Sequence, residues 1–213
     1  MSSRAMILEK LHKAVISGQS NQVIIPLAET RAGDLDVFVT KATAAAAQVT
    51  RTTYQDAPAA IKAIFQDIGC KSSILSDERI VQELGIKTIA GNLGIDCQYV
   101  SEIPGDDYRR RMFQAEVGVS GCDYALADSG SLVMQHDSEN QRLLSLAPNN
   151  YIGIVKASQM LKDRFDLAAI LEKRESKAAV SLVTGVSRTA DVALQVVLGM
   201  HGPRKVYIVL IED

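Results

Sequence analysis

Hydrophobic residues along the chain follow two spacings, one typical of helices and one typical of strands. Apolar residues at helical spacing predict helices over residues 2–17, 36–48 and 56–69. Short runs rich in β-branched residues predict strands between and after them. The predicted strands cover residues 49–53, 72–75, 97–100, 124–128, 131–135, 151–156, 180–184 and 206–211. The later predicted helices cover residues 77–84, 106–116, 158–175 with a break near 166, and 187–199.

This alternation of strands and helices predicts an α/β fold. Parallel strands need crossover connections, so we expect a mainly parallel sheet with helices on both faces. A Ser-Gly turn joins the strands predicted at 124–128 and 131–135, which predicts a β-hairpin insertion. We expect an N-terminal helical segment at residues 1–48 and an α/β domain at residues 49–213.

Charge and hydropathy exclude several classes of protein. The formal net charge is -2, so no overall positive field would hold a nucleic acid. No stretch approaches the ~20 apolar residues that a membrane-spanning helix needs. Charged residues also occupy the N-terminal segment, where a signal peptide would be apolar. We therefore expect a cytoplasmic protein with no membrane span and no nucleic-acid partner.

The three cysteines of the chain, Cys70, Cys97 and Cys122, are widely spaced. A structural zinc or a cysteine-ligated iron–sulfur cluster usually takes four ligands, often in close pairs. One chain of this protein therefore fits neither, and we predict no metal site in it. We expect each cysteine to be a small buried or half-buried side chain. The residues do not identify a cofactor.

The stretch TGVSRTADVALQVVLGMHGP, residues 184–203, predicts a strand end, a polar turn and an apolar helix. Ligands bind α/β sheets at loops that leave the carboxyl ends of strands, and free N–H groups at a helix start attract anions. We therefore expect an anion-binding helix N-terminus that contains Gly185, Ser187, Arg188 and Thr189. Arg188 adds a forked donor suited to carboxylate or phosphate. An ordinary capped turn with Arg188 in solvent explains the spacing equally well.

Asp191 and His201 lie near the two ends of this predicted helix. The Asp191 carboxylate would repel a bound anion unless it pairs with Arg188, binds a metal or turns away, so it is a candidate for chemistry on a ligand. His201 precedes Pro203, which cannot continue the helix. A histidine there commonly contacts the last helical carbonyls, and use as a proton donor or acceptor is the alternative.

The hairpin turn at residues 128–131 is the second candidate site. Turn chemistry explains Asp128, Ser129 and Gly130 by itself. A carboxylate beside a glycine turn is also well placed to reach a substrate, so Asp128 is a candidate catalytic residue. Ser129, Gly130 and Ser131 are then candidate ligand contacts. We interpret residues 136–137 as a polar loop.

These two stretches together resemble the lactate utilization protein C family, also called the LUD domain. The family is marked by a G-x-x-x-x-D-Y-A-x-A-D-[ST]-G-[ST]-L segment and a later S-R-T-A-D…L-G-x-H-G-P segment. In this sequence the first motif consists of Gly118 and residues 123–132. The second motif consists of residues 187–191 and 198–203. The match runs from about residue 49 to the C-terminus, and two motifs in order are far more specific than one.

The resemblance implies the NagB/RpiA/CoA-transferase-like fold. It also implies a role in bacterial oxidation of L-lactate to pyruvate, together with separate iron–sulfur subunits. In that role the chain would be a non-redox component that binds a small anionic ligand or a cofactor. Two positions depart from the family pattern, since Ala193 replaces an acidic residue and Tyr151 replaces a histidine.

Two other functions fit the same residues. The first is a free-standing ATP- or CoA-dependent ligase or acyl-transfer enzyme, related to formyltetrahydrofolate cyclo-ligase or to CoA transferases. Arg188 would then hold phosphate, and Asp128 or Asp191 would act on the substrate. The second is an interaction protein whose turns are only structural. Whether the chain turns over a substrate is open, and the exposed edges of such sheets often pair, which would make a homodimer.

Overall fold

A six-stranded sheet forms the centre of the molecule, which we describe from a computed structural model. The description covers residues 6–7, 9–10, 31–137, 142–173, 177–190, 196–198 and 202–212. The strand order is β1-β12-β7-β4-β2-β3, and every pairing is parallel. The strands are β1 (Ala47–Thr52), β2 (Ser72–Leu75), β3 (Asp96–Tyr99), β4 (Val117–Gly121), β7 (Asn150–Lys156) and β12 (Lys205–Ile211). The predicted α/β class with a mainly parallel sheet is confirmed.

One face of this sheet is covered by three helices, α3 (Ala57–Ile68), α4 (Arg79–Glu83) and α5 (Ile86–Asn92). They bury their apolar faces against alternate residues of the central strands, such as Tyr207 and Val209 of β12. The predicted end of α3 is confirmed, because Gly69 follows it in the left-handed conformation and donates its N–H to Phe65.

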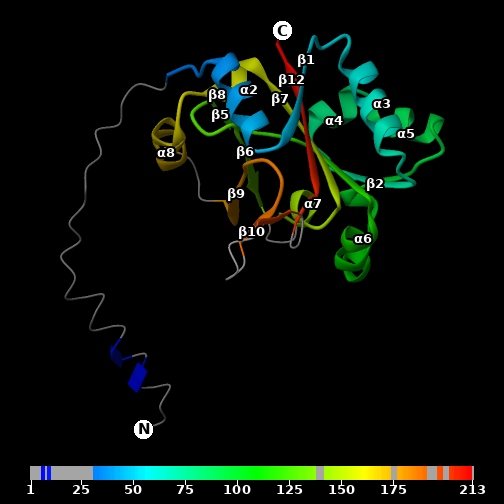
Figure 1. Cartoon of the computed structure of the whole chain (residues 1–213). Coiled ribbons are helices and arrows are strands. Elements are labelled where there is room, and N and C mark those ends of the chain that lie inside the picture. Colours follow the sequence, from blue (N-terminus) through cyan, green and yellow to red (C-terminus); the bar gives the residue numbers. More distant parts are fainter. Residues whose placement is uncertain are drawn as a thin grey trace.

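The other face is covered by helix α2 (Leu35–Ala44) and by a second sheet (Figure 1). The second sheet has the order β8-β5-β6-β9. Its strands are β5 (Tyr124–Leu126), β6 (Ser131–His136), β8 (Met160–Leu161) and β9 (Ala179–Val183). Antiparallel pairing of β5 with β6 confirms the predicted hairpin. Phe38 of α2 is fully buried against residues of both sheets.

Three further α-helices pack around these two sheets. Helix α8 (Arg164–Glu172) packs on the outer face of the second sheet, where Leu167 meets Val133. Helices α6 (Tyr108–Gln114) and α7 (Leu143–Leu146) form a smaller cluster with Ile74 of β2. No helix within the described ranges has both the length and the apolar character needed to cross a membrane.

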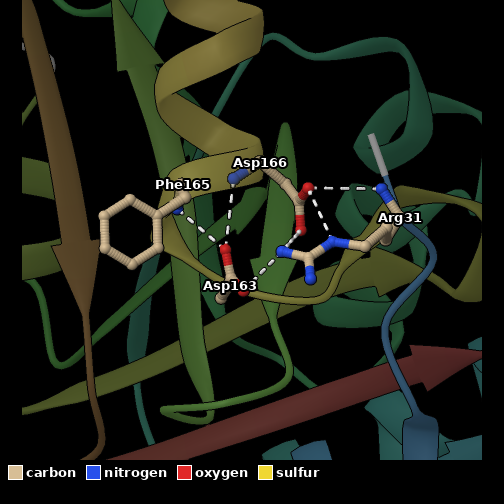
Figure 2. Close-up of polar contacts among 4 residues, drawn as sticks. All are labelled: Arg31, Asp163, Phe165 and Asp166. Atoms are coloured by element: carbon tan, nitrogen blue, oxygen red, sulfur yellow. Dashed lines mark hydrogen bonds and ion pairs between the residues drawn. The ribbon is translucent and has the colours of Figure 1, made fainter. Parts of the chain in front are cut away.

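Arg31 ties the chain before α2 to the start of α8 (Figure 2). Its guanidinium donates to Asp163 at 2.8 Å and to Asp166 at 3.4 Å, and its backbone N–H also donates to Asp166. Asp163 in turn caps α8 by accepting from the N–H groups of Phe165 and Asp166. Asp166 is buried, so Arg31 supplies the charge that balances it.

Two predictions of secondary structure are wrong. The helix expected from residue 158 begins only at Arg164, because residues 157–159 form a short 3-10 turn and residues 160–161 pair as β8. The strand–helix–strand unit expected over 180–211 does not form. Strand β9 instead pairs antiparallel with β6 in the second sheet, while β12 lies in the first.

The N-terminal part of the chain was expected to be a separate helical segment up to residue 48. Residues 6–7 and 9–10 are helical, and the rest of the helix predicted at 2–17 lies outside the described residues. Helix α2 confirms the start of the helix predicted at 36–48 but ends four residues earlier, because residues 47–48 already belong to β1, and it packs into the core. The division of the chain at residue 48 stays a prediction.

Candidate functional site

A cavity of about 310 Å³ lies where strands β2 and β4 end. The carboxyl ends of parallel strands are the usual place for a ligand in an α/β sheet, so this cavity is the candidate functional site. The end of β6 and the start of α7 complete its wall. The lining residues are Ser76, Asp77, Glu78, Val100, Ser120, Asp123, Met134, Gln135, His136, Asp137, Leu144, Ser145 and Lys177.

Glu78 is anchored to the end of β4. Its Oε2 accepts the backbone N–H of Gly121 at 2.6 Å and the hydroxyl of Ser76. A Cβ at position 121 would lie 2.7 Å from Ile80 and 3.1 Å from this oxygen, so glycine permits the close approach. Loss of water contact raises the pKa of Glu78, the charges of Asp123 and Asp77 raise it further, and the two hydrogen bonds oppose the change.

Asp77 and Asp123 connect the cavity wall to neighbouring segments. Asp77 accepts the backbone N–H of Ser101 at 3.0 Å and also the Ser101 hydroxyl, so both of its oxygens are engaged. Asp123 accepts the N–H of Gln135 at 2.7 Å through Oδ2, across the β5–β6 hairpin. Both contacts hold carboxylates at the cavity by local hydrogen bonds.

His136 is the last residue of β6 and is only 8% exposed. Its Nε2 lies 3.0 Å from the hydroxyl of Ser181 on β9. Burial lowers the pKa of His136 below the ordinary value of 6.5, and the charges of Asp123 and Asp137 oppose this change only in part. The ring is therefore mainly neutral at neutral pH, and one of its nitrogens can accept a hydrogen bond.

Tyr151 supports the cavity wall from behind. It is fully buried, and its hydroxyl lies 2.7 Å from the hydroxyl of Ser120, which lines the cavity. The same hydroxyl is 3.6 Å from the sulfur of Met134. Burial raises the pKa of Tyr151 well above 10.0, so the phenol stays protonated. The resemblance noted in the sequence implies a histidine at this position, and the tyrosine present here holds Ser120 in position.

The two turns that the sequence singled out do lie together. The hydroxyl of Ser131 is 2.6 Å from that of Thr184 and donates to that of Ser129 at 2.8 Å. This meeting point is at the start of β6, whereas the cavity is at its end. With a rise of about 3.4 Å per residue, Ser131 and His136 are roughly 17 Å apart.

Both glycines of these turns pack against the end of α2. Gly130 has a φ of +68°, and a Cβ there would lie 2.2 Å from the backbone nitrogen of Ala42. Gly185 has a φ of +66°, and a Cβ there would lie 1.9 Å from the carbonyl oxygen of Ala45. Contact with α2 accounts for glycine at both positions. Their contact with a ligand stays a prediction.

The predicted helix N-terminus after Gly185 is wrong. Residues Arg188–Ala190 form a strand, β10, which pairs antiparallel with β11 (Val196–Leu198). Thr189 lies within β10, and the N–H of Ser187 donates to Pro203 at 3.1 Å. The guanidinium of Arg188 donates to the carbonyl of Ala44 at 3.2 Å, as a basic residue often does at a helix C-terminus.

Of the three other predicted residues with titratable side chains, the structure describes only Asp128, which does not line the cavity. Asp128 is exposed, and its backbone N–H donates to Lys162 in the turn before α8. Asp191 and His201 lie outside the described residues. Their predicted roles in catalysis and ligand binding stay predictions.

The cavity contains residues that the sequence reasoning missed, above all Glu78, Ser120 and Lys177. A usable signal was present, because Glu78 closely follows the strand predicted at 72–75 and such positions meet at one edge of a parallel sheet. The interpretation of residues 136–137 as a polar loop is wrong for His136, which is buried within β6. Asp137 follows the strand and accepts from Lys177 at 2.6 Å.

The cysteines are placed as predicted. Cys70 and Cys122 are buried and Cys97 is partly buried. Burial raises the pKa of Cys70 to about 11 and that of Cys97 to about 12, so both are protonated thiols at neutral pH. In the part of the chain that the structure describes, no group of three or more His, Cys, Asp or Glu side chains could hold a metal ion.

Comparisons with family models and with known proteins point to a single protein family. Residues 35–211 match the model of the LUD domain. Escherichia coli K12 has a similar protein, named uncharacterized protein YkgG, that is 33% identical over 167 residues, which are 74% of this chain and 69% of that protein. Lactate utilization protein C 1 of Bacillus mycoides is 29% identical over 174 residues, 78% of this chain and 74% of that protein. Lactate utilization protein C of Oceanobacillus iheyensis is 25% identical over 169 residues, which are 76% of this chain and 72% of that protein.

A solved structure shares the fold. It is a crystal structure of a DUF162 family protein from Deinococcus radiodurans, with a TM-score of 0.57 and 18% sequence identity. The superposition covers 83% of this chain and 95% of that one. The likeness therefore extends over nearly the whole of the solved domain.

Proposed function

This chain belongs to the LUD domain family, and from that membership we propose that it acts in lactate utilization. The observation that carries the proposal is the match over residues 35–211, together with two relatives named lactate utilization protein C whose alignments cover 76% and 78% of this chain. The proposed role is that of a non-redox component in the bacterial oxidation of L-lactate to pyruvate.

The proposal assigns the redox chemistry to partner proteins. Oxidation of L-lactate to pyruvate releases two electrons, which an acceptor must take up. The three cysteines of this chain are too few for a four-thiolate cluster, and each is buried or half-buried. Iron–sulfur subunits that bind this chain would supply the acceptor.

The proposal also includes a small anionic ligand at the two turns. The hydroxyls of Ser129, Ser131 and Thr184 lie together there, and Arg188 supplies a cation nearby in the chain. An anion at this place would compete with the carbonyl of Ala44 for the guanidinium of Arg188. Asp128, at the tip of the same turn, is the proposed residue for chemistry on the ligand.

Growth of a deletion strain tests the role in lactate utilization. We expect deletion of the gene to abolish growth on L-lactate as sole carbon source. Growth on pyruvate, the product of the oxidation, should be normal because the proposed step is bypassed. Normal growth on L-lactate in a deletion strain without a paralogue would contradict the proposal.

Complementation of that strain tests the proposed ligand binding at the two turns independently of the proposed role in lactate utilization. We expect the wild-type gene to restore growth on L-lactate, and we expect genes carrying Arg188→Ala or Asp128→Ala to restore it only weakly. Circular dichroism and the abundance of each variant control for folding. If both folded variants restore full growth, the two turns are structural and the ligand part of the proposal fails while the role in lactate utilization stands.

A further inference from the structure

We infer that the cavity bordered by Glu78, Asp123 and His136 binds a small ligand that carries a positively charged amino group rather than a free carboxylate or phosphate. This is a second site, separate from the two turns at the other end of β6. The inference does not depend on the role in lactate utilization.

The charge of the cavity wall is the first argument. Four carboxylates line it, while the amino group of Lys177 is the one ammonium among the described lining residues and donates to Asp137 at 2.6 Å. His136 is mainly neutral at neutral pH. Arg142 lies near enough for its charge to lower the pKa of His136, but it is not a lining residue. A carboxylate or phosphate ligand would therefore meet an excess of like charge.

Free acceptor atoms are the second argument. Glu78 uses Oε2 for both of its hydrogen bonds, and Asp123 uses Oδ2 for its bond to Gln135. Among the described residues, no donor is bonded to Oε1 of Glu78 or to Oδ1 of Asp123. Two carboxylate oxygens are thus available at one cavity, and ammonium groups form strong, charge-assisted hydrogen bonds with such oxygens.

The third argument is the ring of His136, which is more than nine-tenths buried. Its Nε2 is bonded to Ser181, and its Nδ1 has no partner within the described ranges. In those ranges, the only fully buried side-chain nitrogen or oxygen without a partner is Oγ of Ser73. The Nδ1 of His136 therefore keeps some open surface, and the cavity is the surface that this residue lines. It can accept a third hydrogen bond from a ligand when Nε2 carries the proton.

Repulsion within the wall explains why a cation would be favoured. The charges of Asp123 and Asp77 add to the effect of burial on the pKa of Glu78, so these carboxylates are close enough to interact. A cation bound among them relieves this repulsion. Among the described residues, no group of three or more His, Cys, Asp or Glu side chains is arranged to hold a metal ion. An organic ammonium needs only hydrogen-bond acceptors, which the cavity has.

A panel of four small probes tests the charge preference. Isopropanolamine, propylene glycol, lactamide and L-lactate share one hydroxylated carbon skeleton and differ at one end, which is an ammonium, a hydroxyl, an amide or a carboxylate. Each is titrated into the full-length protein at neutral pH, and binding is followed by NMR through the His136 ring and the backbone amides of Glu78 and Asp123. We expect isopropanolamine to bind about tenfold more tightly than L-lactate, with the two neutral probes between them.

Two outcomes of this titration would overturn the inference. One is that L-lactate binds as tightly as isopropanolamine or more tightly. The other is that no probe shifts the signals of the cavity residues at tens of millimolar.

Variants give the matched control. Glu78→Gln and Asp123→Asn keep an oxygen for the existing backbone N–H donors but remove one charge each. We therefore expect each variant to bind isopropanolamine several-fold more weakly. Binding of propylene glycol should stay nearly unchanged. Asp106→Asn removes an exposed charge away from the cavity and should change neither. If Glu78→Gln does not fold, Asp123→Asn alone decides. Isopropanolamine binding at the wild-type level in the folded variants would refute the inference.

Discussion

At the scale of single residues, Gly185 shows how a turn is shaped by the helix it touches. Its positive φ and its approach to the carbonyl of Ala45 are both unfavourable for any residue with a Cβ. The neighbouring N–H of Val186 donates to the same carbonyl at 3.2 Å, so the turn also caps the end of α2. The sequence predicted that Gly185 belongs to an anion-binding turn, and the structure shows its backbone close to the end of a helix.

We expect Gly185→Ala to lower the free energy of unfolding by about 2–4 kcal/mol, because it adds both a strained φ and a steric clash. Gly69→Ala is the matched control. Gly69 has nearly the same φ, +65°, but a Cβ there would meet nothing within 4 Å. Its cost should be about 1 kcal/mol. Chemical denaturation followed by circular dichroism measures both, and equal losses would show that the approach to α2 is not the cause.

At the scale of elements, the start of α8 depends on a residue far away in the sequence. Asp163 caps the helix, and Arg31 holds both Asp163 and Asp166 (Figure 2). The side chain of Asp166 is 1% exposed and that of Arg31 is 44% exposed, so one end of the pair is desolvated and the other is not. This contact joins the segment before α2 to the second sheet.

We expect Arg31→Ala to lower the free energy of unfolding by about 1–3 kcal/mol, less than a fully buried pair would cost because Arg31 is partly solvated. Hydrogen exchange in α8 should also become faster, since its first turn loses support. Arg79→Ala is the control, because Arg79 pairs with Glu83 while 90% exposed. That change should stay within about 0.5 kcal/mol. An equally small effect of Arg31→Ala would mean that Asp166 needs no counter-charge.

At the scale of the whole molecule, α2 links the two sheets and the two turns. Phe38 and Ala42 are fully buried between the sheets, and Gly130 and Gly185 both rest on the end of the helix. Removing a buried phenylalanine side chain alone typically costs about 3–5 kcal/mol. The helix therefore contributes an amount comparable with the whole stability of a domain.

Truncation tests whether the chain divides at residue 48. We expect a chain that starts at Arg31 to unfold cooperatively at nearly the temperature of the full-length protein. A chain that starts at Val49 should lack a cooperative transition, because it loses α2 and the first residues of β1. Differential scanning calorimetry measures both. A cooperative transition in the shorter chain would support an independent domain at 49–213.

Much of the local structure can be predicted from the sequence. The end of α3 at Gly69 and the hairpin at 128–131 are specified by side chains close in sequence, because a left-handed glycine and a Ser-Gly turn act locally. A continuous apolar run likewise identifies a strand buried on both faces, such as β12, and the order of strands and helices identifies a parallel sheet. The burial of the three cysteines follows from their apolar character and spacing.

Only the tertiary structure decided where β9, β10 and the cavity lie. The mixed polar and apolar stretch at 187–199 fits a helix or a strand by periodicity alone, and pairing of Arg188 with Leu198 selects the strand. Glu78, Asp123 and His136 come from three segments whose meeting depends on which strands pair, which no local pattern encodes. The sequence alone thus determined most of the elements and the family, because short-range propensities and ordered motifs are written along the chain. The site was decided by long-range pairing, which brings distant residues to one edge of the sheet.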